Sequence, residues 1–85
     1  MKRFKLNEIR QAATAIVHDC QKYHAIAARE VYQDQETKEI IVIPCGGADE
    51  RLMRANPSRY ELVGVYDKGL DKASLLGDLN SLREA

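Results

Sequence analysis

One segment carries residue types that can do chemistry. An apolar, strand-like run (40–44) ends at Cys45, and Gly46 and Gly47 then lead into a predicted short helix. Beside a helix N-terminus, free backbone N–H groups and the helix dipole favour an anion, so a thiol there can become a nucleophilic thiolate. The N–H groups of Gly46, Gly47 and Ala48 would form an oxyanion-binding nest. Cys45 is therefore the candidate nucleophile of a thiol-dependent enzyme or redox protein.

A nucleophilic thiol needs a base, and the sequence offers only His18 and His24, both in a predicted first helix. No third residue that would orient such a base can be recognised. The alternative interpretation is that Gly46 and Gly47 make a turn and Cys45 fills a small apolar niche. We favour this alternative, and we therefore expect no catalytic residue and no enzyme activity.

A metal site is the other chemistry to consider, because His18, Cys20 and His24 lie close in sequence and Cys45 would be a fourth ligand. A helix turns about 100° per residue, which places His18 on the opposite side from Cys20. Structural and catalytic zinc sites need three or four converging ligands. The glycines also lack the lysine and the spacing of a phosphate-binding loop. We expect neither a metal nor another cofactor.

The composition predicts one compact domain spanning residues 1–85. Hydrophobic residues make up 45% of the chain and charged residues 31%, which is typical of a globular protein. Two cysteines are too few for a disulfide scaffold, and no apolar stretch approaches the roughly 20 residues of a membrane span. We expect a cytoplasmic protein with no membrane partner.

Charge is balanced in total but not along the chain. Thirteen basic and thirteen acidic residues cancel, whereas residues 1–29 carry a basic surplus and residues 30–50 an acidic one. The alternative function that follows is nucleic-acid binding by the basic N-terminal segment, through Lys2, Arg3, Lys5, Arg10 and Lys22. A neutral domain binds polyanions poorly, so we expect no nucleic-acid partner.

Two helices are predicted from apolar stripes. Residues 7–24 have Asn7 as the predicted N-cap and apolar residues at three- and four-residue steps. A last helix begins after a capping Asp71 and carries a leucine stripe. The two stripes consist of Ile9, Ala12, Ala13, Ile16, Val17 and Cys20 in the first helix, and Leu75, Leu76, Leu79 and Leu82 in the second.

Three strands are predicted between these helices. Val31 and Tyr32 favour a strand in segment 25–33, although residues 25–29 fit a helix or a strand. Strand 39–44 has consecutive β-branched residues, which predict burial on both faces and a central position. A short helix (49–55) ends before Pro57, and strand 60–67 has apolar residues on both faces.

The predicted order is α-β-β-(short α)-β-α, an α+β fold in which two helices pack on one face of a three-stranded antiparallel sheet. The helix–three strands–helix part resembles the double-stranded-RNA-binding domain, a family that holds phosphates with a lysine cluster opening its second helix. The corresponding segment, 68–74, contains Asp71 and no lysine cluster. The resemblance therefore implies a topology and not RNA binding.

With no catalytic constellation, we expect a small protein-binding domain that acts as an inhibitor, adaptor or regulatory subunit, such as a phage or mobile-element accessory protein. Four of the five aromatic residues are tyrosines, which are favoured at interfaces. Pairing with a second copy would also relieve the thin core of so short a chain. The predicted contact residues are Tyr32, Gln35, Glu36, Glu39, Arg51, Arg54, Arg59 and Tyr60.

Overall fold

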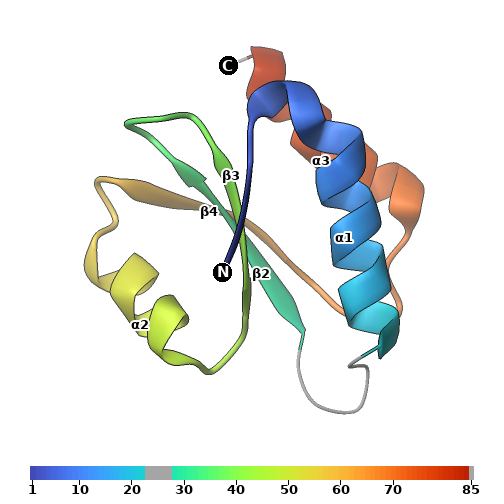
Figure 1. The fold of residues 1–85 in the computed structure, drawn as a ribbon, viewed down its shortest axis with the longest axis horizontal. Coiled ribbons are helices and arrows are strands. Elements are labelled where there is room, and N and C mark those ends of the chain that lie inside the picture. Colours follow the sequence, from blue (N-terminus) through green and yellow to red (C-terminus); the bar gives the residue numbers. More distant parts are fainter. Residues whose placement is uncertain (23–27, 85) are drawn as a thin grey trace.

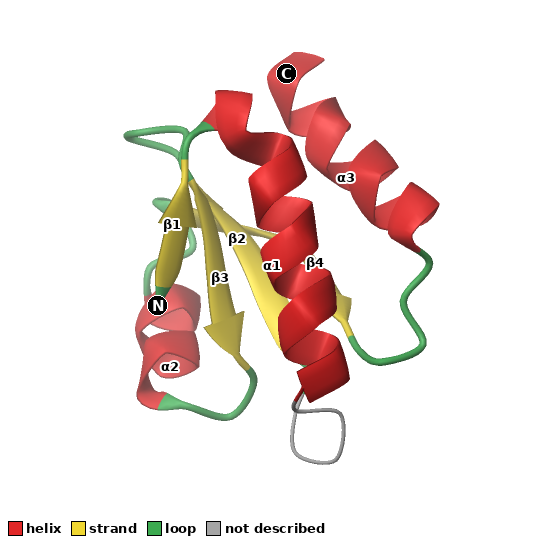
Figure 2. Ribbon diagram, turned by 45° about the vertical axis from the view of Figure 1, so that its right-hand side comes forward, coloured by secondary structure: helices red, strands yellow, loops and turns green. Residues whose placement is uncertain are grey.

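The computed structural model describes residues 1–22 and 28–84 and shows a four-stranded antiparallel sheet between two helical layers (Figure 1). Two long helices lie on one side of the sheet, which we call the two-helix face, and one short helix lies on the other, which we call the α2 face (Figure 2). The helices are α1 (Ile9–Lys22), α2 (Ala48–Ala55) and α3 (Lys72–Glu84). The strands are β1 (Lys2–Phe4), β2 (Arg29–Asp34), β3 (Ile40–Pro44) and β4 (Tyr60–Tyr66), in the spatial order β1-β3-β2-β4.

The predicted α+β class is confirmed, but the predicted sheet of three strands is wrong. β1 adds a fourth strand, antiparallel to β3, with Arg3 opposite Ile41. Three residues, two of them charged, carry no strand pattern of their own. The strand forms because β3 would otherwise leave a row of backbone N–H and C=O groups unpaired beside the core. β3 is therefore a central strand, as its β-branched run predicted.

The helices also differ from the prediction. The short helix 49–55 is present as α2, but it lies on the opposite face from α1 and α3, so the domain has three layers. This helix and β1 are both additions to the helix–three strands–helix order of the double-stranded-RNA-binding domain. The termination of α2 before Pro57 and the capping of α3 by Asp71 are as predicted, since Asp71 Oδ1 accepts the Ala73 N–H at 3.0 Å.

The predicted N-cap of the first helix is wrong. A 3₁₀ turn, η1 (Leu6–Glu8), precedes α1 and contains Asn7. The turn starts at Lys5, whose backbone N–H donates to Glu8 Oε2 at 3.0 Å while its carbonyl accepts the Glu8 N–H at 2.9 Å. The predicted helix end at His24 and the ambiguous residues 25–27 lie outside the described residues; β2 has begun by Arg29.

Alternation along β2 and β3 supplies apolar side chains to both faces. The larger core lies under α1 and α3 and contains Ile9, Ala12, Ala13, Ile16, Cys20, Val31, Ile40, Val42, Tyr66, Leu75 and Leu79. The smaller core lies under α2 and contains Tyr32, Ile41, Ile43 and Met53. The predicted apolar stripes of α1 and α3 thus meet the sheet on the same side, as the prediction of two helices on one face required.

A β-bulge in β4 reverses the alternation of that strand. Val31 pairs with Gly64 while the next residue, Tyr32, pairs with Leu62, so Val63 is the extra residue. Val63 packs on the larger core and Gly64 lies opposite a residue of that core. Leu62 and Val65 therefore both lie on the α2 face, separated by two residues directed to the other face.

Candidate protein-binding groove

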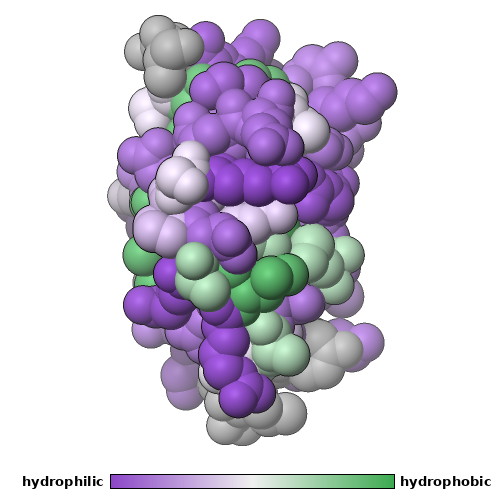
Figure 3. Space-filling model, turned by 90° about the vertical axis from the view of Figure 1, so that its left-hand side faces the viewer, coloured by the Kyte–Doolittle hydropathy of each residue, from purple (hydrophilic) through white to green (hydrophobic). Residues whose placement is uncertain are grey.

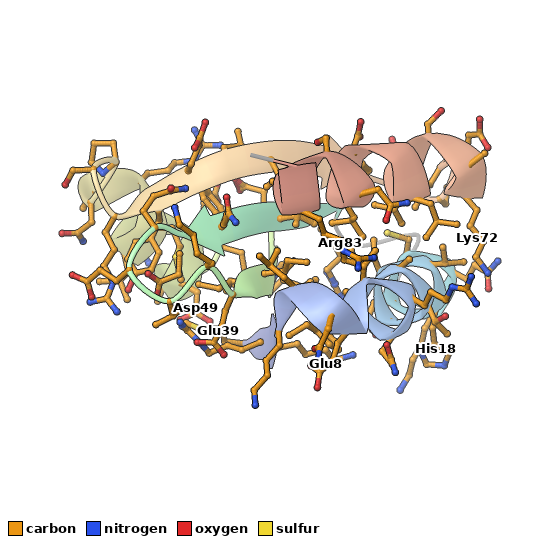
Figure 4. All side chains as sticks on the ribbon, turned by 90° about the horizontal axis from the view of Figure 1, so that it is seen from above. Glu8, His18, Glu39, Asp49, Lys72 and Arg83 are labelled. Atoms are coloured by element: carbon orange, nitrogen blue, oxygen red, sulfur yellow. The ribbon has the colours of Figure 1, made fainter. Side chains whose placement is uncertain are left out.

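Within residues 1–22 and 28–84, the structure brings no histidine base to Cys45 (Figure 4). Burial raises the pKa of the Cys45 thiol, and the carboxylates of Glu30 and Glu50 raise it further. A raised pKa lowers the thiolate fraction at neutral pH, which is opposite to what a nucleophile needs. His18 is exposed on α1, and Figure 4 places it at the other end of the molecule from Asp49, in the first turn of α2. His24 lies outside the described residues.

One N–H group of the predicted oxyanion nest is hydrogen-bonded within the chain itself. The Gly46 N–H donates to the Glu50 carboxylate, which comes from the first turn of α2. Gly46 has a φ of +80°, a conformation that favours glycine, so the turn interpretation accounts for this residue. Among the described residues, no group of three or more His, Cys, Asp and Glu side chains is placed to hold a metal ion. Cys20 is buried, and its thiol donates to the Tyr66 carbonyl at 3.4 Å.

A buried carboxylate that the sequence analysis missed joins α2 to the sheet. Glu30 is 1% exposed, and its Oε1 accepts hydrogen bonds from the Tyr32 hydroxyl at 2.7 Å and from Arg54 Nη2 at 3.0 Å. Its Oε2 has no hydrogen-bond partner within the described residues. Burial, together with the bond to Glu30, raises the pKa of Tyr32 to about 12, so its hydroxyl stays protonated. These contacts fix the orientation of Tyr32 and Arg54. The available signal was a charged residue, Glu30, directly before Val31 in a predicted strand.

A second buried carboxylate organises the end of the β2–β3 hairpin. Asp34 has no exposed surface and accepts from Arg3 at 2.7 Å, from Arg59 at 3.2 Å and from the Glu36 N–H at 2.9 Å. Burial alone would raise the pKa of Asp34, but these bonds, that from Arg59 first, hold it well below its usual range. Arg59 also pairs with Glu36, and Arg3 with Glu39, both at 3.3 Å. Two predicted contact residues of this region, Glu36 and Arg59, thus pair with each other, and a third, Glu39, pairs with Arg3.

The basic N-terminal segment is similarly engaged. Lys2 pairs with Asp19 of α1 at 2.9 Å, and Arg3 pairs with the hairpin as described above. Lys2 and Arg3, two of the six basic residues in segment 1–29, are therefore paired with acids far away in sequence. This arrangement leaves fewer cations for a nucleic-acid phosphate backbone than the sequence count implies.

Three predicted contact residues meet in a groove between α2 and β4. The groove has a volume of about 380 Å³ and a mainly apolar lining of Tyr32, Met53, Arg54, Pro57, Tyr60, Glu61 and Leu62. Tyr32 is 2% exposed and so contributes only to the floor, whereas Tyr60 is half-buried and lies at the wall. The Arg59 guanidinium lies 5.2 Å from the centroid of the Tyr60 ring. Gln35 donates to Glu61 at 3.1 Å beside the groove.

Large apolar side chains stand exposed on α2 and β4, and one of them, Leu62, lines this groove. Leu52 of α2 is 50% exposed, and Leu62 and Val65 of β4 are 44% and 55% exposed. Figure 3 looks onto the side of the molecule that carries α2 and shows hydrophobic side chains gathered among hydrophilic ones. Arg51, the remaining predicted contact residue, is exposed on α2. None of these three apolar residues was predicted to contact a partner. For Leu62 and Val65 the sequence did contain a signal, because strand 60–67 has apolar residues on both faces.

A larger hollow lies elsewhere on the surface and is less suited to recognition. It has a volume of about 550 Å³ and lies over the outside of α1, against Arg10, Gln11, Thr14, Ala15 and His18. All five residues come from consecutive turns of one helix, so no second element forms an opposing wall. Binding sites are concave and enclose much of their ligand, which this surface does not.

Comparison with known proteins gives no family for this chain. No protein-family model, curated protein or solved structure matches it. Within residues 1–22 and 28–84, no helix combines the length and the hydropathy needed to cross a bilayer. Function therefore has to be inferred from the α2–β4 groove and its surroundings.

Proposed function

We propose that this chain is a non-catalytic protein-binding domain, acting as an inhibitor, adaptor or regulatory subunit, and that its contact site is the α2–β4 groove. The observation that carries the proposal is the mainly apolar groove between α2 and β4, in whose lining Leu62 stands exposed. Monomeric proteins seldom leave clustered apolar side chains in water unless a partner covers them.

The surrounding charges support a rigid contact surface. Around the groove, Arg54 is held by Glu30 and Glu50, and Arg59 by Asp34 and Glu36. Side chains that are already ordered lose less conformational entropy when a partner binds. Tyr60, fixed between the groove and the Arg59 guanidinium, is the kind of aromatic residue that dominates interface energetics.

The chemistry of the partner follows from the lining. An apolar side chain of the partner would enter beside Tyr60 and Leu62, where the wall is hydrocarbon. Where the partner passes over the exposed side of α2, a carboxylate would meet Arg51, which has no ion pair in the described part of the chain. The proposed partner is therefore a protein segment that combines an apolar anchor with an acidic neighbour.

The experiment is capture of partners by the tagged full chain from nuclease-treated lysate of the native host, with matched variants. Tyr60→Ala removes an aromatic wall, and Arg51→Glu reverses an exposed charge without touching the core. His18→Ala, on the outer face of α1, is the control. We expect a stoichiometric protein to be captured by wild type and His18→Ala, and binding to be weakened roughly 30-fold by Tyr60→Ala and about 10-fold by Arg51→Glu.

Two results would contradict the proposal. One is a partner retained equally by wild type and both groove variants, which would place contact on another surface. The other is capture that depends on nucleic acid and disappears with nuclease. Circular dichroism of each variant distinguishes a lost contact from a lost fold, and Arg51→Glu remains informative if Tyr60→Ala fails to fold.

A further inference from the structure

β4 presents an unpaired edge. The sheet ends with β4, which pairs with β2 on one side and with no strand of the described chain on the other. Seen from above, β4 and α3 run along one side of the molecule and α1 along the other (Figure 4). An edge strand of seven residues exposes a row of backbone N–H and C=O groups that can template another strand. β1, the opposite edge, has only three residues.

The bulge gives β4 a palindromic pattern of faces. Leu62 and Val65 lie on the α2 face, Val63 and Gly64 between them on the two-helix face, and Glu61 and Tyr66 outside them also on the two-helix face. Two residues at equal distances on either side of the midpoint between Val63 and Gly64 therefore lie on the same face of the sheet. A strand without a bulge alternates strictly, so two residues placed symmetrically about such a midpoint would lie on opposite faces.

We propose that β4 pairs antiparallel with β4 of a second copy of this chain, about a twofold axis between Val63 and Gly64. In this register Leu62 lies opposite the second copy's Val65, and by symmetry the same contact occurs twice. Four exposed apolar side chains then form one cluster on the α2 face. The two sheets become one continuous sheet whose faces coincide, so both grooves open on the same side.

Charge is compatible with self-pairing. The one acidic or basic residue within β4 is Glu61, and the register places it opposite Tyr66 rather than opposite itself. The chain has zero formal net charge, so two copies approach without long-range repulsion. Contact through one short strand is small for an interface, and we expect a dissociation constant on the order of micromolar. This inference goes beyond the proposed function, and it shares Leu62 with the proposed partner-binding groove.

The test is sedimentation equilibrium of the purified full chain and three variants, with no partner added. Leu62→Glu and Val65→Lys each place two charges in the apolar cluster of the dimer, and each should weaken dimerisation at least about 100-fold. The double variant Leu62→Glu/Val65→Lys places Glu opposite Lys at both symmetric positions, and it should dimerise at least 10-fold more tightly than either single variant.

The double variant makes the test specific for register. Restored dimerisation supports the pairing of Leu62 with the second copy's Val65. A wild-type chain that stays monomeric to about 100 μM overturns the proposal, as do single variants that dimerise like wild type or a double variant no better than the singles. Both residues are exposed, and urea unfolding of dilute samples checks that each variant folds.

Discussion

The two faces of the sheet receive similar apolar side chains but very unequal cover. On one face, α1 and α3 contribute 14 and 13 residues, and they enclose the larger core. On the other, α2 has eight residues, which span only about 12 Å, whereas β4 is about 23 Å long. A helix of that length cannot cover the whole face, so Leu62 and Val65 stay in water. The difference separates a face that stabilises the fold from a face available for recognition.

Truncating one leucine on each face should give the largest contrast. Leu79 of α3 is fully buried, so Leu79→Ala should lower the free energy of unfolding by about 3 kcal/mol, through lost transfer energy and a residual cavity. Leu62→Ala, at a side chain 44% exposed, should cost less than about 1 kcal/mol. Urea denaturation of dilute protein measures both. Equal losses would mean that the α2 face is as important for folding as the two-helix face.

The Asp34 ion cluster should make the α2 side sensitive to acid. Its folded-state pKa is lowered, so the stabilisation is present above the unfolded value of about 4 and is lost as pH falls through the folded value. Asp34→Asn should reduce stability at pH 7 on the order of 2 kcal/mol, and the deficit should shrink as the pH falls below about 4. Urea unfolding of the wild type and the variant, at pH 7 and at a pH below about 4, measures this loss in the free energy of unfolding.

The control for that experiment is Glu36→Gln, at a side chain 66% exposed, which should change little. A deficit for Asp34→Asn that is constant with pH would show that the carboxylate contributes through shape rather than through charge.

The smallest expected effect concerns the two thiols. Burial raises the pKa of both Cys20 and Cys45, so alkylation at pH 7 should be slower for each than for an unperturbed cysteine. Cys45, which is only partly buried, should still react before Cys20. Mass spectrometry of peptides after timed iodoacetamide treatment gives both rates. Rapid modification of Cys45 would revive the thiol-enzyme interpretation.

Local patterns in the sequence were sufficient for most elements. The apolar stripe of α1, the Asp71 cap and the β-branched run of β3 are signals contained within a few neighbouring residues. β1 was not predictable in this way, because a strand of Lys2, Arg3 and Phe4 exists only through its pairing with β3. The prediction that Asn7 caps the first helix was wrong, because Asn7 lies inside a turn that the bonds between Lys5 and Glu8 close.

The groove was only partly predictable from sequence. Tyr32, Arg54 and Tyr60 were chosen for residue type, and their meeting depends on which face α2 covers, which residue order does not specify. The cluster around Glu30 and the bulge at Val63 are likewise results of strand register. The apolar residues on both faces of strand 60–67 indicated that Leu62 and Val65 contact something. The sequence did not indicate that α2 leaves this part of its face of the sheet uncovered.

The central claim is that recognition uses the α2 face, and hydrogen–deuterium exchange of the domain with and without its captured partner tests it most directly. We expect added protection in α2 and β4, with exchange in α1 and α3 unchanged. Both samples are kept well below the micromolar dissociation constant expected for the dimer proposed above, so that a change in β4 reports on the partner. Protection confined to α1 and α3, with α2 and β4 unaffected, would contradict the account.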